Sequence, residues 1–330
     1  KVIKMLYAGL DIHKSFCQAI LMTEAGEVIK EAEILTTKED ITKFFSEILG
    51  VRVAIESTGI WEPVFDWLEN LGYEVKLAHP LKTKAIAYAK VKTDKISARI
   101  LADLLRANLL PESYIPPKEI RELRNICRER KGIVCERTRW KNRIKAELAR
   151  RGIKSIFDNL YTKDGRNWLR SLNIPKITRA ISTVEFLNER IKEIDKTIKA
   201  KSKDIPEIKI LETIPGVGTY SATFIYAEIG EIDRFCHSEK VSMYAGVVPS
   251  TKQSSEHTKH GHITKEGSSY LRWILTECTQ THVSRYSTKL TQFYRRIMLR
   301  RGKQKAIVAT VRKLTKIIYW MLKNKETFKW

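Results

Sequence analysis

The sequence predicts a mixed α/β domain followed by two largely helical regions, and three observations support this. Short apolar segments alternate with helical patterns over about the first 110 residues. Pro111, Pro116 and Pro117 then interrupt that pattern. Beyond them, apolar residues recur at three- and four-residue spacing, which is typical of amphipathic helices. With 330 residues we expect more than one domain, and we place the domains at 1–112, 113–205 and 206–330.

The first domain is expected to alternate strands and helices in a specific order. We place strands at Lys4–Leu10, Ser15–Thr23, Gly26–Leu35, Val51–Ile55 and Tyr73–Ala78. Helices are expected at Lys38–Leu49, Pro63–Leu71 and about Thr93–Leu109. Thr37 is a suitable N-cap for the first helix, and Pro63 is placed at the first position of the second. Three opening strands followed by alternating helices and strands predict an RNase H-like domain.

The middle region predicts two long amphipathic helices around a shorter insert. The first runs from about Lys118 to Arg151 and the second from about Ile177 to Ser202. In the second helix, apolar side chains from Ile181 to Ile198 fall on one face. Two such helices favour an antiparallel coiled-coil arm or a dimer seam.

The charge of the chain favours a polyanionic partner, because its formal net charge is +23. Residues 118–154 hold 14 Lys and Arg against 5 Asp and Glu, a net of +9. A solvated helix face is the alternative, but that surplus makes repulsion costly without a polyanion. The candidate phosphate contacts on this helix are Arg121, Arg124, Arg128, Lys131, Arg137, Arg139, Lys141, Arg143 and Lys145.

Several classes of protein are excluded by composition. No apolar run approaches the roughly 18 residues of a membrane-spanning helix, and no secretory signal pattern is seen. The five cysteines are scattered and form no CxxC pair, which argues against a disulfide framework and a cysteine zinc site. We therefore expect a cytoplasmic protein with no membrane partner.

Three carboxylates fall at the ends of predicted elements in the first domain. Asp11 follows the first strand, Glu56 ends the fourth, and Asp94 opens a helix. In an RNase H-like sheet the first and fourth strands are neighbours, and the helix that begins at Asp94 packs across them. The three carboxylates would therefore cluster. Each alone also fits a turn, strand-end or helix-cap residue. Together they predict a site for a hard divalent ion, Mg²⁺ or Mn²⁺, that would assist phosphodiester chemistry.

The last third predicts mostly helices. Leu211–Ile229 has the pattern of a helix-hairpin-helix, followed by a mostly helical segment at Asp233–Tyr244. Gly216 and Gly218 permit a tight turn whose backbone N–H groups form a phosphate cradle, although a plain helix–helix turn also favours glycine. A pair of helices is expected from Tyr270 to about Leu322.

Between these helices, Gly246–Gly267 predicts a long polar loop rich in hydroxyl groups, His and Lys. A serine there is a candidate nucleophile if a base or metal activates it, whereas a solvated surface loop is the alternative. Candidate nucleic-acid contacts in the loop are Lys259 and Lys265. The spacing of His257, His260 and His262 matches no zinc site, so phosphate contact or no role is favoured there.

Taken in order, these motifs resemble insertion-sequence transposases that have an N-terminal DEDD (RuvC-like) domain and a C-terminal catalytic serine. That family includes Piv-type DNA invertases and bridge-RNA-guided recombinases. The motifs are GLDIHK (Gly9–Lys14), AIESTGIWEP (Ala54–Pro63), KTDKISA (Lys92–Ala98), TIPGVG (Thr213–Gly218), YAGVVPS (Tyr244–Ser250), QSSE (Gln253–Glu256) and HITKEG (His262–Gly267). The resemblance covers nearly the whole chain.

The resemblance implies a Mg²⁺-binding RuvC-like domain, a coiled coil used in dimerisation, and a serine that attacks DNA to form a phosphoserine intermediate. It implies DNA partners at the element ends and target, and a structured guide RNA that selects them. At least two copies would act together, because carboxylates and serine would come from different domains and protomers. It also implies a nucleoid-associated location in the cytoplasm.

Two positions of the resemblance bear on catalysis. Gln253–Glu256 matches a Gln-Ser-Gly-like setting, which assigns Ser254 as the nucleophile and Ser255 as the alternative. The third motif of the family is Thr-Asp-x-x-Asp-Ala, so Ser97 stands where the fourth carboxylate is expected. Asp103 lies nine residues after Asp94, on the opposite helix face, and is no substitute.

Three functions are therefore consistent with the sequence. The first is an active DNA recombinase that forms a covalent serine adduct. The second is a RuvC-like junction nuclease that hydrolyses DNA with metal ions and without an adduct. The third is an RNA- or DNA-binding copy, decayed or engineered, that no longer cuts because of Ser97.

Overall fold

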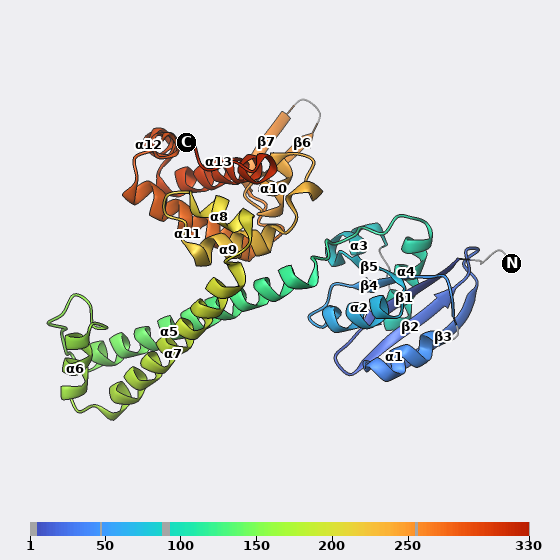
Figure 1. Ribbon diagram of the computed structural model, residues 1–330, viewed down its shortest axis with the longest axis horizontal. Coiled ribbons are helices and arrows are strands. Elements are labelled where there is room, and N and C mark those ends of the chain that lie inside the picture. Colours follow the sequence, from blue (N-terminus) through green and yellow to red (C-terminus); the bar gives the residue numbers. More distant parts are fainter. Residues whose placement is uncertain (1–4, 47, 88–92, 255–256, 330) are drawn as a thin grey trace. The chain divides into compact units, whose positions relative to one another are not determined.

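A five-stranded sheet forms the centre of the first of two units into which the chain divides, Lys1–Ile115 and Pro116–Trp330. The computed structural model describes residues 5–46, 48–87, 93–254 and 257–329, with the backbone alone at 251–254 and 257–260. The strand order is β3 (Val28–Leu35), β2 (Phe16–Met22), β1 (Leu6–Ile12), β4 (Val51–Glu56) and β5 (Glu74–Ala78) (Figure 1). The first three strands are antiparallel, whereas β1, β4 and β5 are parallel. The fold is thus mixed α/β, and the predicted proximity of β1 and β4 is confirmed.

The first strand extends further than the sequence predicts. Asp11 lies within β1, paired with Gln18, instead of following the strand. The antiparallel pairing continues to Ile12 and Cys17 because both side chains are buried and extend the core. Asp11 is therefore held by the sheet, with 6% of its surface exposed.

Helices cover both faces of this sheet. The buried faces of α1 (Lys38–Phe45) and α2 (Trp61–Asn70) share one core with Leu10. On the other face, α4 (Asp94–Arg106) packs with Tyr7 and Ala54. A short helix that was not predicted, α3 (Pro80–Ile86), follows β5. The expectation for Pro63 is wrong, because α2 begins two residues earlier, at Trp61.

Gly9 allows α4 to cross β1 at unusually short range. A Cβ at this glycine would lie 2.0 Å from the carbonyl oxygen of Ala98 and 2.7 Å from the backbone nitrogen of Ala102. Because those are backbone atoms of the helix, they could give way only if α4 moved. Small residues on both sides therefore set the position of the helix whose first residue is Asp94.

Two long antiparallel helices, α5 (Lys118–Arg150) and α7 (Pro175–Ser202), begin the second unit (Figure 1). Their direction follows from the contacts, since Arg130 bonds to Asp195 and Arg137, further along α5, bonds to Asn188. The insert between them contains a helix that was not predicted individually, α6 (Lys163–Ser171). Of the helices within the described residues, none offers the apolar length that a bilayer crossing requires.

The rest of this unit packs helices around a second core. Its elements are α8 (Pro206–Glu212), α9 (Thr219–Ile229), the short 3₁₀ helix η1 (Ile232–Arg234), α10 (Ser238–Tyr244), α11 (Ser269–Arg285), α12 (Lys289–Arg301) and α13 (Lys303–Asn324). The prediction of two helices from Tyr270 to about Leu322 is wrong, because three helices, α11, α12 and α13, are present there. Thr288 caps the start of α12, and Gly302, at a φ of 81°, separates α12 from α13.

The segment predicted as a long polar loop contains a β-hairpin. The antiparallel strands β6 (Pro249–Ser254) and β7 (His257–Ile263) pair Ser254 with His257. Neither strand shows the apolar alternation that identifies a half-buried strand. Backbone hydrogen bonds hold the two strands together, and they require no particular side chains. The pairing is therefore not visible as an apolar pattern in the sequence.

We predict that Gly9→Ala destabilises the first unit by about 1–3 kcal/mol, because the added methyl group must displace α4. Denaturant unfolding followed by tryptophan fluorescence measures this change. Gly59→Ala is the matched control, since a Cβ there meets nothing within 4 Å. Equal stability of the two variants would contradict the assigned role of Gly9.

Candidate functional site

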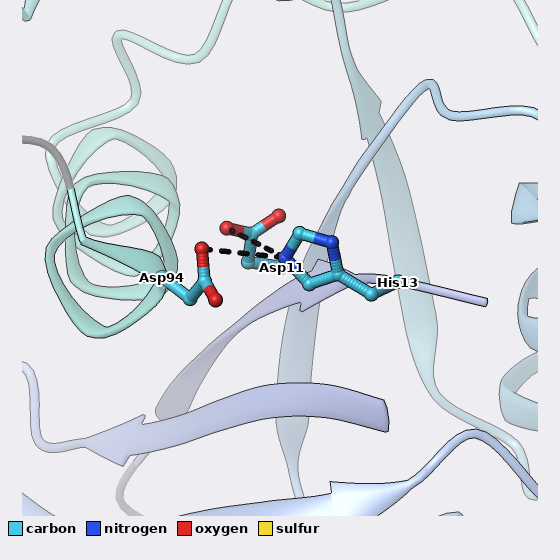
Figure 2. Close-up of side chains that lie close together, drawn as sticks. All are labelled: Asp11, His13 and Asp94. Carbon is cyan, nitrogen blue, oxygen red and sulfur yellow. Dashed lines mark ion pairs between the residues drawn. The ribbon is translucent and has the colours of Figure 1, made fainter. Parts of the chain in front are cut away.

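Two residues at the end of β1 and one at the start of α4 form a compact cluster of potential metal ligands. The ligand atoms of Asp11, His13 and Asp94 all lie within 4.8 Å of one another. His13 Nε2 is 3.3 Å from Asp94 Oδ1 and 3.8 Å from Asp11 Oδ2. Figure 2 shows that the two carboxylates approach the same nitrogen of the imidazole ring. Of the three carboxylates predicted to cluster, Asp11 and Asp94 therefore lie together.

Local structure fixes Asp94 at this position. Thr93 caps α4, its hydroxyl oxygen accepting a hydrogen bond of 3.3 Å from the backbone N–H of Ile96. Asp94 is then the first helical residue, where the positive end of the helix dipole stabilises a carboxylate. The close packing at Gly9 brings that helix end to the sheet.

His13 is the member of the cluster that sequence reasoning did not select. Its ring stacks on Phe16 with a centroid separation of 4.6 Å. The backbone is held as well, because the Thr36 hydroxyl donates to the His13 carbonyl oxygen over 2.8 Å. A signal was available, since a residue two positions after Asp11 on an extended chain points to the same face.

The other expected ligands lie on the same face of the sheet but outside this tight group. Gly9 and Ala54 are paired on the α4 face, and two residues further along each strand come Asp11 and Glu56. Glu56 does not belong to the group whose ligand atoms lie within 4.8 Å. Ser97 is three residues, nearly one helical turn, after Asp94.

Asp103 forms ion pairs away from the cluster, as its position on the opposite face of the helix predicts. Its carboxylate pairs with Arg106 at 3.1 Å and with Arg99 at 3.8 Å. It therefore supplies no fourth carboxylate at the beginning of α4.

The charge of Asp11 acts in a poorly solvated environment. Burial, and next the negative charge of Asp11, raise the pKa of the Cys17 thiol to about 12. Cys17 thus stays a neutral thiol and adds no ligand charge at neutral pH. Two carboxylates and an imidazole at this spacing have the donor atoms of a divalent-cation site.

The hairpin that bears the candidate serine is anchored by backbone contacts at its base. The N–H groups of Thr264 and Lys265 donate to the carbonyl oxygens of Val248 and Gly246, over 2.9 and 3.2 Å. These bonds join the two sequence motifs on either side of the serine, Tyr244–Ser250 and His262–Gly267.

Two glycines make this base possible. Gly246 and Gly267 have φ angles of 66° and 85°, and a Cβ at either would lie 2.2 Å from a carbonyl oxygen of the facing segment. Ser254 is the last residue of β6. Its side chain and Ser255 lie outside the described residues, as do the side chains of His257, Lys259 and His260.

A buried ion pair connects this base to α5. Ser268, the N-cap of α11, donates to Glu228 Oε2 over 2.7 Å. The Glu228 side chain is fully buried and accepts a 2.7 Å hydrogen bond from Arg128 Nε. Arg124 donates to the carbonyl oxygens of Ala227 and Glu228.

The basic residues of α5 thus have different surroundings. Arg124, Arg128 and Arg137 bond to other parts of the protein, and Arg121 is buried. These contacts account for them without a nucleic acid, which the sequence pattern did not indicate. Lys131 and Lys141 lie over aromatic rings and are partly exposed. The exposed members are Arg139, Arg143 and Lys145, of which Arg143 lies over the Trp140 ring.

The two glycines of the predicted phosphate cradle have different surroundings. Gly216, at a φ of 91°, packs against α11, where a Cβ would lie 3.2 Å from the backbone nitrogen of His282. Gly218 is exposed at the N-terminus of α9, with nothing near its missing Cβ. His262, in β7, and Lys265, at the hairpin base, are both exposed.

Comparison with known proteins covers both units. A family profile described as "Transposase" matches residues 8–151, and one described as "Transposase IS116/IS110/IS902 family" matches residues 208–295. The chain is 25% identical to the transposase for insertion sequence element IS1111A of Coxiella burnetii, over 100% of this chain and 92% of that protein.

Two further relatives extend this similarity. The transposase for insertion sequence element IS1328 of Yersinia enterocolitica is 23% identical over 97% of both chains. The pilin gene-inverting protein of Moraxella bovis is 28% identical over 84% of this chain and 82% of that protein.

Proposed function

Because this chain belongs to the IS116/IS110/IS902 family of transposases, we propose that it cuts and rejoins DNA with a metal-assisted serine nucleophile. The observation that carries the proposal is the cluster of Asp11 and Asp94 at the end of β1. The strand order and its antiparallel-to-parallel change support a RuvC-like, RNase H-like identity for the first unit.

The metal half of the proposal rests on the carboxylates of the first unit. Asp11 and Asp94 would hold the ion, with Glu56 contributing from the end of the neighbouring strand. Mg²⁺ or Mn²⁺ bound there would polarise a phosphodiester and stabilise the charge that develops on its oxygens.

The nucleophilic half rests on the serine hairpin of the second unit. Ser254 Oγ would attack the phosphorus atom, form a phosphoserine bond and release one DNA oxygen, which takes up a proton. Ser255 is the alternative nucleophile. The base of the hairpin supports this assignment, because backbone hydrogen bonds join its two segments there, and Ser254 is the last residue of β6.

Nucleic acid would bind along the outer part of the α5–α7 pair, which is formed by the C-terminal part of α5 and the N-terminal part of α7. A groove of about 650 Å³ there is lined by Trp140, Arg143, Arg150, Lys176 and Arg179, among other residues. Hydrogen bonds from Arg150, Lys176 and Arg151 lower the pKa of Glu147, which stays ionised and offsets only part of this charge. An aromatic ring among cations suits an unpaired base beside phosphates, which favours a structured guide RNA in addition to DNA.

The α5–α7 pair would also serve dimerisation. The pairs of two copies would pack together as a coiled coil and form a dimer.

Two other functions keep specific support. A metal-dependent junction nuclease would need the carboxylates and not the serine. A nucleic-acid-binding copy that does not cut is favoured by Ser97, which offers only a neutral hydroxyl beside the cluster. Both make predictions that differ from those of the recombinase.

We predict a covalent protein–DNA adduct when the full chain meets a cognate junction with Mn²⁺ or Mg²⁺ and the element's RNA. Denaturing gels with end-labelled DNA detect it. Ser254→Ala should abolish the adduct and Ser250→Ala, in the same strand, should retain it. Cut ends without attached protein would support the nuclease instead. An adduct that persists in Ser254→Ala and Ser255→Ala would contradict the serine mechanism.

We predict that Ser97→Asp strengthens divalent-ion binding by about tenfold or more, because it adds a carboxylate beside the cluster. Isothermal titration with Mn²⁺ measures this gain. Ser46→Asp, at the C-cap of α1 on the opposite face of the sheet, adds the same charge and should leave affinity unchanged. A gain of DNA cleavage with Ser97→Asp would show an impaired copy, whereas unchanged metal affinity would contradict the proposed ligand position.

We predict that the triple variant Arg139→Glu, Arg143→Glu and Lys145→Glu weakens nucleic-acid binding and lowers the slope of log K against log salt by about 2–3. The physical reason is the loss of three exposed phosphate contacts. Filter binding across a salt series measures both effects. The control Lys38→Glu, Lys43→Glu and Lys84→Glu makes the same change in net charge on the first unit. Equal losses in both variants would exclude a specific surface on α5.

A further inference from the structure

The imidazole of His13 faces inward although the residue is at the surface. The His13 side chain is 41% exposed, yet its Nε2 atom is buried and makes no well-aligned hydrogen bond with the described residues. A buried nitrogen in that state loses its hydration without a compensating bond, which costs free energy. The atom lies between two carboxylates (Figure 2).

From this geometry, and resting on the metal centre proposed above, we infer that His13 Nε2 is itself a metal ligand. We further infer that this nitrogen shifts the site from Mg²⁺ toward a first-row transition ion such as Mn²⁺.

The distances agree with ligands that share one ion. Metal–ligand bonds of about 2.1 Å place neighbouring ligand atoms roughly 3.0 Å apart in an octahedron and roughly 3.4 Å apart in a tetrahedron. Nε2 is 3.3 Å from Asp94 Oδ1 and 3.8 Å from Asp11 Oδ2. The 3.3 Å separation already fits such a site, the 3.8 Å separation must shorten by about 0.4 to 0.8 Å, and the ligand atoms of the two carboxylates lie within 4.8 Å of one another.

The ring is prepared for this role before any ion binds. Stacking on Phe16 fixes the plane of the imidazole. The His13 backbone N–H donates to the Phe16 carbonyl oxygen over 2.9 Å, and the Thr36 hydroxyl donates to the His13 carbonyl oxygen. Side-chain entropy that would oppose binding has therefore already been lost in folding.

The donor set explains the choice of ion. Mg²⁺ prefers oxygen ligands, whereas imidazole suits transition ions, and Mn²⁺ accepts both kinds of donor. Ser97 adds only a neutral hydroxyl on the next turn of α4. The nitrogen of His13 therefore completes a site that is poorer in carboxylate charge than an all-oxygen site.

Electron paramagnetic resonance of the full chain with Mn²⁺, without DNA, tests this inference. Titration gives the affinity, and electron spin-echo envelope modulation detects a ¹⁴N nucleus bonded to the ion. We expect a directly bonded ¹⁴N signal in the wild type. His13→Gln should lose the signal and bind Mn²⁺ about tenfold or more weakly. The control His237→Gln removes an exposed imidazole of the second unit and should retain both properties.

His13→Asp separates a ligand from a packing residue. A carboxylate there makes the site all-oxygen, so the ¹⁴N signal should vanish while the ratio of Mg²⁺ to Mn²⁺ affinity rises. If His13 only packs on Phe16, His13→Gln leaves that ratio unchanged. Circular dichroism and thermal unfolding identify a variant that has failed to fold, and the other variant then decides the outcome.

The outcomes also distinguish this inference from the proposed function. Mn²⁺ bound without a ¹⁴N signal, or a signal that persists in both His13 variants, overturns the role of His13 alone. Mn²⁺ affinity that is unchanged in Asp11→Asn and in Asp94→Asn overturns the metal centre itself. The serine adduct is a separate measurement and depends on neither signal.

Discussion

The close packing of α4 on β1 at Gly9 is the contact on which the candidate metal centre depends. No other residue type leaves room for the helix backbone there, because a single methyl group would meet the Ala98 carbonyl oxygen at 2.0 Å. That approach brings Asp94, at the start of the helix, beside Asp11 in the strand. The sheet then sets the spacing of the site, since β1 also orients His13 and lies next to β4 with Glu56.

The serine hairpin is built on the same physical principle. Gly246 and Gly267 let two backbone segments approach more closely than any side chain would allow, and hydrogen bonds close the base between them. Ser268, next to this base, donates a hydrogen bond to Glu228, whose buried carboxylate is neutralised by Arg128 of α5. A buried carboxylate without its partner is costly, so this ion pair fixes the helix relative to the hairpin base.

The large positive charge of the chain has two distinct uses. Part of it is internal, as in Arg124 and Arg128, which satisfy buried acceptors between helices. The rest is external, at residues such as Arg139, Arg143 and Lys145. Only the external part is available to a polyanion, so the number of cations on α5 overstates the size of a nucleic-acid surface. This distinction concentrates the proposed binding surface on the outer part of the α5–α7 pair.

The sequence by itself determined most of the strands and helices of the first unit, because periodicity and capping act over a few residues. Their RNase H-like order then placed β1 beside β4 and brought Asp11 and Asp94 together. Tertiary structure alone decided that His13 turns inward and that Arg128 meets Glu228, 100 residues away. It also decided that the polar segment forms a hairpin. Such contacts depend on close approach between distant segments, and a pattern of neighbouring residues carries no record of that approach.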